Sequence, residues 1–491
     1  MSSGDEADSS PAAAAQPSGS PAGSSAGGPS AGGAGAADKA GAADAAAAIR
    51  SRGYLVLLGF AAVLGVPLAV GAWAFLQAVA HMQTAVFTDL PTSLGFHGVP
   101  AWWPLLPLAV AGIVVALTVR YLPGTGGHLP ANGFTTGGVA PPAQLPGILL
   151  AATASIGLGA VVGPEAPLIA LGGGIAAAVM QLVLRATGRA GGDPRAVEMA
   201  AAAGSFAAVS ALLGSPLLGA FLLMEAAGLG GPTLGLVLMP GLLASGIGAL
   251  VFTGMDSWTG LSSTSLTIPG LPLPEAPTFA EFGWALALGV AAAVAGQLIH
   301  RGAKALQALV LPRMLWLTPV MGLAVAGLAI GYAEATGHST QDVLFSGQDQ
   351  IGPVVTNSAK YTVAALALLL LLKAVAYAVS LSAFRGGPIF PAIFLGAVGG
   401  IAMSHLPGLQ LVPAVAMGIG ALTDAMLGLP LTAVLLATLL LGKGGVTAMP
   451  LVIVAVVVCH VVSAVLTPRR KKSEEQAKGQ GRVEGGSPQA A

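Results

Sequence analysis

Glu165 is the residue of this sequence best placed to do chemistry, because it is a lone carboxylate in an apolar stretch. It lies in the segment 163–167, which reads GPEAP, and no Asp, Glu, Lys or Arg occurs between Arg120 and Glu165 or between Glu165 and Arg185. An ionisable group at such depth in a membrane costs about 2.5–3.5 kcal/mol on insertion scales. We therefore interpret Glu165 as a functional residue.

Two prolines flank this glutamate and predict where a helix begins. Proline suits the first turn of a helix and disfavours its interior, so Pro164 and Pro167 predict a broken membrane helix that restarts at Glu165. The free N–H groups of such a terminus carry the positive end of the helix dipole and bind anions. A carboxylate on the same turn can fill the anion site itself. The alternative is a simple capping glutamate, which would normally lie in water.

The other lone acids leave two alternative classes of protein to consider. Glu225 is a second isolated acid, and Asp424 is an intramembrane acid late in the chain. A secondary transporter of another kind, for a cation or a metabolite, would use such acids in pairs. An intramembrane enzyme would need a motif such as HExxH, GxSxG or paired membrane aspartates, and the apolar spans contain none. We expect a protein that is not an enzyme.

Composition excludes several partners and defines the broad class. The 491 residues are 55% apolar and 8% charged, against about 25% charged in soluble domains, which predicts an all-α polytopic membrane protein. A net charge of zero gives no electrostatic case for binding nucleic acid. The single cysteine, Cys459, cannot build a cysteine metal site. Asp342 and Asp349 lack the spacing of a full set of calcium ligands. We expect no metal and no cofactor.

The chain divides into a tail, a membrane domain and a second tail. Residues 1–48 are rich in Ala, Gly, Ser and Pro and are expected to be disordered. Residues 49–467 form the membrane domain, and 468–491 form a short tail that begins with a basic cluster. By the positive-inside rule we expect a cell-membrane protein with both termini cytoplasmic. The expected spans are 53–88, 101–119, 146–162, 165–184, 196–213, 233–253, 283–309, 314–333, 361–383, 389–403, 411–426, 430–442 and 446–466.

The two halves of the membrane domain, about 53–253 and 283–466, echo each other. The segment 163–167 has a counterpart in 387–391, which reads GPIFP. Gly204 precedes Pro216 by twelve residues, as Gly418 precedes Pro430 by twelve. Paired halves with Gly/Pro-broken segments at matching places indicate an inverted repeat with a site between broken helices. Chance similarity of Gly- and Ala-rich segments is the alternative.

These motifs in this order resemble the CLC family of chloride channels and chloride/proton antiporters. Segment 124–130 is similar to the family's GSGIP loop, 163–167 to its GREGP motif and 386–391 to its GGIFAP region. The resemblance covers about residues 50–466. It implies an inverted repeat of tilted and broken helices, and a homodimer with one pore per subunit. The transported ions across the lipid bilayer would be chloride or other small anions, together with protons in the antiporters.

The resemblance also implies roles for single residues. Glu165 would be the gating glutamate, which fills an anion site when deprotonated and opens the path when protonated. The hydroxyl of Thr125 would stand at the central anion site. Backbone amides would complete the anion site, namely those of Gly163, Ala166, Ile389 and Phe390.

This sequence departs from the family pattern at several of these positions. Pro164 replaces the arginine of the gating motif, and Pro388 removes one backbone donor. The second, proton-handling glutamate of the antiporters falls at Ala226, so Glu225, one residue earlier, is the candidate for a proton path. No tyrosine occurs in 446–466 to match the family's central-site tyrosine. These departures predict chloride conduction with weak proton coupling, with a chloride/proton antiporter as the alternative.

Overall fold

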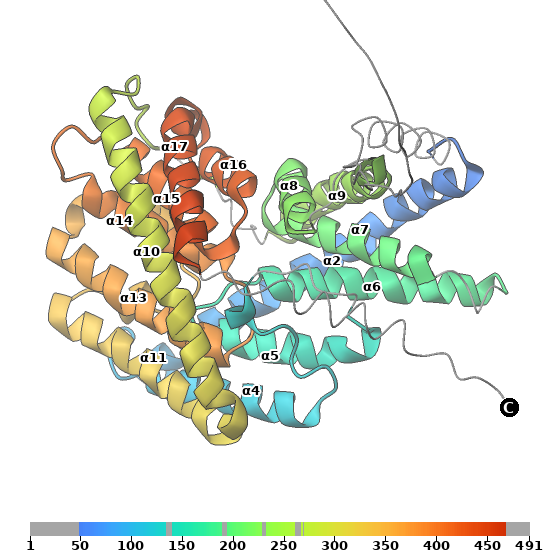
Figure 1. Ribbon diagram of the computed structural model, residues 1–491. Helices are drawn as coiled ribbons and strands as arrows, with labels where there is room; N and C mark the ends of the chain where they lie inside the picture. Colours follow the sequence, from blue (N-terminus) through green and yellow to red (C-terminus); the bar gives the residue numbers. More distant parts are fainter. Residues whose placement is uncertain are drawn as a thin grey trace, which may run out of the picture.

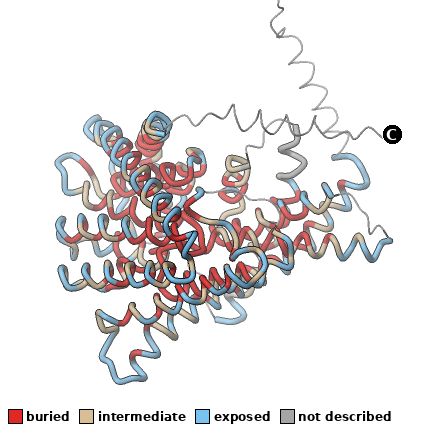
Figure 2. The backbone as a smooth tube through the Cα atoms, turned by 60° about the horizontal axis from the view of Figure 1, so that its bottom comes forward, coloured by how far each residue is buried: buried red, intermediate tan, exposed pale blue. Residues whose placement is uncertain are grey.

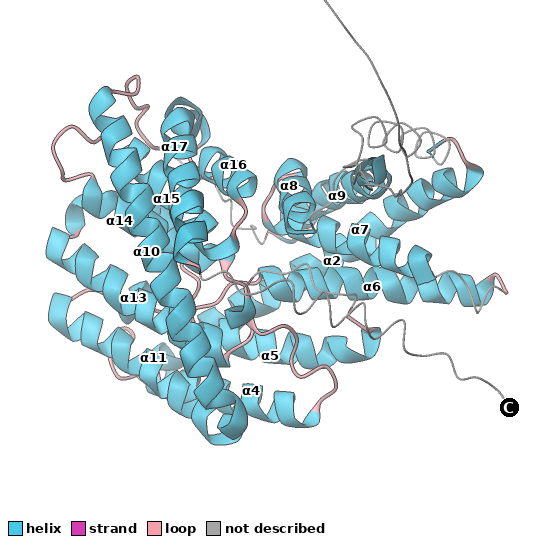
Figure 3. Ribbon diagram, viewed as in Figure 1, coloured by secondary structure: helices cyan, strands magenta, loops and turns pink. Residues whose placement is uncertain are grey.

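The computed structural model describes residues 49–133, 140–188, 194–227, 232–260, 267–268 and 270–467. Every named element in these ranges is a helix, as Figure 3 shows, and one isolated β-bridge joins two loops. The all-α prediction is confirmed. The two expected tails, 1–48 and 468–491, lie outside the described residues.

The helices follow the expected spans closely, because prolines, glycines and changes in hydropathy mark most of their ends. In the first half they are α2 (Arg52–Thr84), the π-helical turn η1 (Ala85–Asp89), α3 (Leu90–Ser93), α4 (Leu105–Tyr121), α5 (Leu145–Gly157), α6 (Glu165–Ala186), α7 (Pro194–Leu212), α8 (Pro216–Ala227) and α9 (Pro232–Thr259). In the second half they are α10 (Phe279–Val310), α11 (Met314–Thr336), α12 (Ile351–Thr356), α13 (Val363–Ala383), α14 (Ile389–Met403), α15 (Leu411–Leu427), α16 (Pro430–Leu440) and α17 (Gly442–Leu466). Helices α3, α8 and α12 have no counterpart among the expected spans.

The internal repeat is visible in matching glycine contacts. Gly172 lies on α6, seven residues after Glu165. It meets Gly204 of α7 so closely that a Cβ on either glycine would collide with the backbone of the other. Gly396, seven residues from the start of α14, meets Gly418 of α15 in the same way. Small residues let membrane helices approach closely. The glycines at matching places in the sequence therefore build the same helix crossing in each half.

Other helix pairs repeat in the same manner and place the two halves side by side. Helix α2 packs on α9 in the first half, and α10 packs on α17 in the second. Helices α4 and α11, one from each half, pack against each other at the bottom of Figure 1. Helices α8 and α16 face each other near the top of that view and are also in contact. The contacts between the halves thus join like elements.

The core of the molecule is centred on helices that few exposed residues interrupt, α14 and α15 above all. Figure 2 shows buried backbone through the centre and exposed residues on the outer helix faces and helix ends. Helices α14 and α15 are buried along almost their whole length. Among the described residues, six helical segments are long and apolar enough to cross a membrane by length and composition. The exposed apolar side chains of the outer helices suit a lipid surrounding.

Candidate functional site

Two loops cross immediately before α6 and α14, and their backbones pair there. The N–H of Gly163 donates to the carbonyl of Gly387 at 2.8 Å, and the N–H of Gly387 donates back at 2.6 Å. The hydroxyl of Ser380 on α13 accepts a hydrogen bond from the N–H of Val161 at 3.0 Å. This pairing brings together the N-termini of two helices that are more than 200 residues apart in the sequence.

Glycine is required at both paired positions because the side chain of Glu165 occupies the space beside them. A Cβ built on Gly163 or on Gly387 would collide with the Glu165 carboxylate. The two glycines therefore leave a space that this carboxylate fills. The requirement explains why the motifs 163–167 and 387–391 both begin with glycine.

The carboxylate of Glu165 is fully buried and reaches from one helix N-terminus to the other. Glu165 is the first residue of α6, and its Oε1 accepts a hydrogen bond of 2.7 Å from the N–H of Phe390 in the first turn of α14. Within the described part of the chain its Oε2 has no hydrogen-bond partner. A buried oxygen without a partner is costly, so this arrangement suits an acid that can take up a proton or leave the site.

The Glu165 carboxylate lies between two helix N-termini. It belongs to the first residue of α6 and accepts a hydrogen bond from the first turn of α14, and helix N-termini carry the positive end of the helix dipole. The structure gathers five of the six predicted anion-site residues around this crossing, namely Gly163, Glu165, Ala166, Ile389 and Phe390. The N–H of Gly163 is already used by the loop pairing. The donor that the carboxylate uses is therefore in the first turn of α14, at Phe390.

Thr125, the sixth predicted residue, connects to the crossing through Arg385. It has a left-handed backbone, with φ of 49°, and its side chain is exposed. Its carbonyl accepts hydrogen bonds of 3.3 Å from both Nε and Nη2 of Arg385. The backbone N–H of Arg385 in turn donates to the hydroxyl of Ser155 at 3.1 Å. In this structure it is the carbonyl of Thr125 that connects to the crossing.

Tyr377 is a site residue that the sequence reasoning missed. It lies on α13, is fully buried, and its hydroxyl donates a hydrogen bond of 2.7 Å to the carbonyl of Pro388, immediately before α14. The family pattern points to a tyrosine in 446–466, whereas Tyr377 lies on α13. A lone tyrosine in an apolar helix directly before the GGPIFP segment was the available signal, because a buried tyrosine hydroxyl needs a partner.

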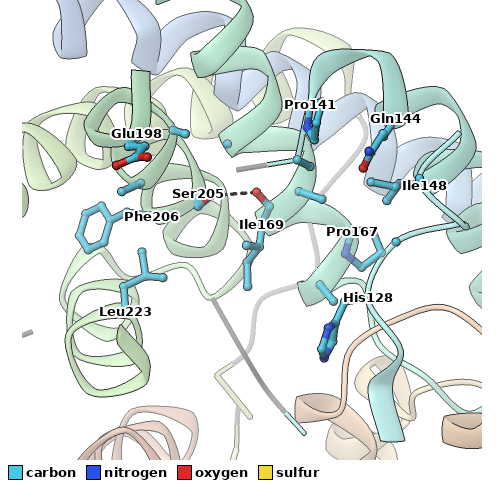
Figure 4. Close-up of a pocket in the computed structure, with 18 of the residues that line it drawn as sticks. His128, Pro141, Gln144, Ile148, Pro167, Ile169, Glu198, Ser205, Phe206 and Leu223 are labelled. Atoms are coloured by element: carbon cyan, nitrogen blue, oxygen red, sulfur yellow. Dashed lines mark hydrogen bonds between the residues drawn. The ribbon is translucent and has the colours of Figure 1, made fainter. Parts of the chain in front are cut away.

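A cavity of about 1090 Å³ opens beside the crossing. Its walls include the first turn of α6 at Ala166 and Pro167, the loop at Gly126 and Gly127, and Arg385. Figure 4 shows Glu198, Phe206 and Leu223 on the side opposite Pro141, Gln144, Pro167 and His128. Most of the lining is apolar or small, with few polar groups. The cavity therefore reaches the first turn of α6, next to the buried Glu165.

Glu225 caps a helix of the other repeat. Its Oε1 accepts from the N–H of Leu431 at 2.8 Å, and its Oε2 accepts from the N–H and the hydroxyl of Thr432 at 2.8 and 2.7 Å. These donors form the N-terminus of α16, which has no capping side chain from its own preceding residue. A carboxylate at this end satisfies the free N–H groups and the helix dipole. The bonds hold α8 and α16 together.

Two more buried charges have partners within the second repeat. Asp424 on α15 forms an ion pair of 3.1 Å with His460 on α17. Lys373 on α13 is fully buried, and its ammonium donates to the carbonyls of Asp342 and Leu344 at 2.8 and 3.0 Å. Lys373 therefore satisfies backbone carbonyls inside the protein and does not extend to the membrane surface. Among the described residues, no group of three or more His, Cys, Asp or Glu could hold a metal ion.

The fold and the site define a helical membrane protein in which two similar halves meet at a buried carboxylate. The model of the family described as "Voltage gated chloride channel" matches residues 130–464, and the chain belongs to this family. Family membership supports anion transport as the class of activity.

Relatives and solved structures agree with this assignment. The ion-transport protein YfeO of Escherichia fergusonii is 28% identical over 338 residues, which are 66% of this chain and 74% of that protein. YfeO of Escherichia coli strain SE11 is 28% identical over 344 residues, 68% of this chain and 75% of that protein. A slow cyanobacterial Cl⁻/H⁺ antiporter superposes with a TM-score of 0.64 and 18% identity, covering 87% of this chain and 99% of that one. A CLC-type fluoride/proton antiporter superposes with a TM-score of 0.62 and 16% identity, covering 83% and 95%.

Proposed function

We propose that this protein carries small anions, chloride foremost, across a cell membrane along a path gated by Glu165. The observation that carries the proposal is the 2.7 Å bond between the Glu165 carboxylate and the N–H of Phe390. The carboxylate occupies the place where two helix N-termini would bind an anion. Protonation removes its charge, weakens this bond and frees the site for chloride.

We further propose that proton coupling is weak. A proton relay needs a carboxylate able to exchange protons along a path, and Ala226 cannot serve. The adjacent Glu225 is already held by three donors at the N-terminus of α16, which fixes its carboxylate in place. The alternative, a chloride/proton antiporter, is favoured by the activities named for the two superposed structures. In that case Glu225 or a chain of water molecules would carry the proton.

The test records chloride and proton movement together from liposomes that contain the purified protein. We expect chloride efflux without matching sodium efflux, and little uphill proton uptake when a chloride gradient is imposed. Sodium movement in place of chloride movement would contradict the anion proposal. Stoichiometric proton pumping would contradict weak coupling, and its loss in Glu225→Gln would assign the relay to Glu225.

The assembly and orientation follow from the family resemblance and the charge pattern. We propose a homodimer with an independent path in each subunit and with both termini cytoplasmic, since basic residues cluster at 469–472 and at Arg50 and Arg52. A linked dimer with one inactivated subunit should keep about half of the flux. Complete loss of flux would contradict independent paths.

A further inference from the structure

Arg385 is a buried cation that no carboxylate balances within the described part of the chain. Its side chain is 2% exposed, and the ion pair found among the described residues joins His460 and Asp424 instead. Its hydrogen bonds all go to backbone carbonyls, two to Thr125 at 3.3 Å and one to Phe384 at 3.4 Å. Neutral carbonyls orient a guanidinium but do not cancel its charge, and a buried charge is costly unless it is paired.

The hydrogen bonds of Arg385 leave part of its donor set unused. A guanidinium has five N–H donors. Nε has one and uses it, whereas Nη1 and Nη2 have two each and use one each. One N–H on each of the two Nη atoms therefore lacks an acceptor among the described residues. A pair of donors on a planar cation is a recognised anion-binding arrangement.

Arg385 lies at the wall of the cavity beside α6. Arg385 lines the same cavity as Ala166 and Pro167, which belong to the first turn of α6 beside Glu165. The other fully buried cation, Lys373, differs in both respects. Its ammonium is surrounded by two carbonyls and lies 4.1 Å from the ring centre of Phe394, and it does not line the cavity.

We propose that Arg385 holds a small monovalent anion, chloride or another halide, in this cavity. This site is separate from the one filled by the Glu165 carboxylate and lies before it on the same path. It concentrates anions beside the gate and supplies the countercharge that the guanidinium lacks. The inference rests on the proposed function, since the anion at Arg385 is taken to be the transported one.

The test uses bromide, which is visible by anomalous diffraction, in crystals of the full chain. Wild-type crystals should show a bromide peak in the cavity against the Nη atoms of Arg385. Arg385→Gln should lose this peak, Arg385→Lys should keep it because the charge remains, and the exposed Arg120→Gln is the matched control that also keeps it. If wild-type crystals show no bromide peak at Arg385, the proposal is overturned whatever the variants show.

Flux measurements separate this inference from the proposed function. With chloride varied on the cavity side, Arg385→Gln should raise the half-saturating concentration about tenfold, and Arg120→Gln should leave it unchanged. If wild-type liposomes carry no chloride, the proposed function fails. If they carry chloride while Arg385→Gln keeps the wild-type chloride dependence, the Arg385 site alone is refuted.

Discussion

Replacing Glu165 by glutamine should make chloride flux insensitive to pH and raise it at alkaline pH. In the wild-type protein the ionised carboxylate accepts the 2.7 Å bond from the N–H of Phe390 and blocks the site. A hydrogen bond to a charged group contributes about 1.5–3 kcal/mol and a neutral one about 0.5–1.5 kcal/mol. The neutral amide is thus held about 1–1.5 kcal/mol less tightly. At about 1.4 kcal/mol per factor of ten, this predicts five- to tenfold more flux.

Glu165→Ala extends the same reasoning, because it removes the blocking group altogether. Losing the whole charged hydrogen bond, about 1.5–3 kcal/mol, predicts about 10- to 150-fold more flux at alkaline pH. In the wild-type protein flux should rise as pH falls, since protonation neutralises the blocking carboxylate. An increase in flux on removing or protonating the carboxylate therefore indicates a gate. A decrease would indicate a carboxylate that must be charged for transport.

The assay is chloride efflux from liposomes over a range of external pH, with a buried glutamate elsewhere as the control. Glu281 is also fully buried, but its carboxylate caps α10 and accepts from the N–H of Thr278 at 3.0 Å. Glutamine serves the same capping role, so Glu281→Gln should keep the wild-type pH profile. Wild-type pH dependence in Glu165→Gln would refute the gate.

Three further outcomes are expected. Deletion of residues 1–48 should leave chloride flux intact, because their composition cannot repay ordering entropy of about 1–2 kcal/mol per residue; lost flux in correctly inserted protein would contradict this. Glu225→Gln should lower stability by about 1 kcal/mol in thermal unfolding while sparing the pH profile of flux. Burial raises the pKa of Asp342, so the folded state binds this proton more tightly and loses stability as pH rises. Asp342→Asn should therefore raise the melting temperature at pH 7 but not at pH 4, and equal shifts at both would argue against that account.

The sequence predicted the features that depend on local chain chemistry. Proline after glycine marked the starts of α6 and α14, and an isolated acid in an apolar stretch singled out Glu165. The twelve-residue spacing from Gly204 to Pro216 recurs in the second half. The repeated glycine lies at a close helix crossing in each half, α6 on α7 and α14 on α15. These signals work because backbone breaks and intramembrane charges have strong physical costs that are visible at single positions.

Features that depend on which distant segments meet could not be read from the sequence. Tyr377 reaches the carbonyl of Pro388 only because the loop before α14 turns back over α13. Glu225 was predicted only as a candidate for a proton path, and its hydrogen-bond partners at the start of α16 lie more than 200 residues later. Arg385 donates to the carbonyl of Thr125, which lies 260 residues earlier in the chain. Each of these contacts crosses between elements whose packing no local pattern specifies.

Chloride titration of purified wild-type protein and Glu165→Ala at alkaline pH tests the central claim most directly. The claim is that the Glu165 carboxylate occupies an anion site formed by the N-termini of α6 and α14. Removing the carboxylate should then vacate that site, and calorimetry should show one more bound chloride per chain in the variant than in the wild type. Equal chloride stoichiometry in the two proteins, with both correctly folded, would contradict the claim.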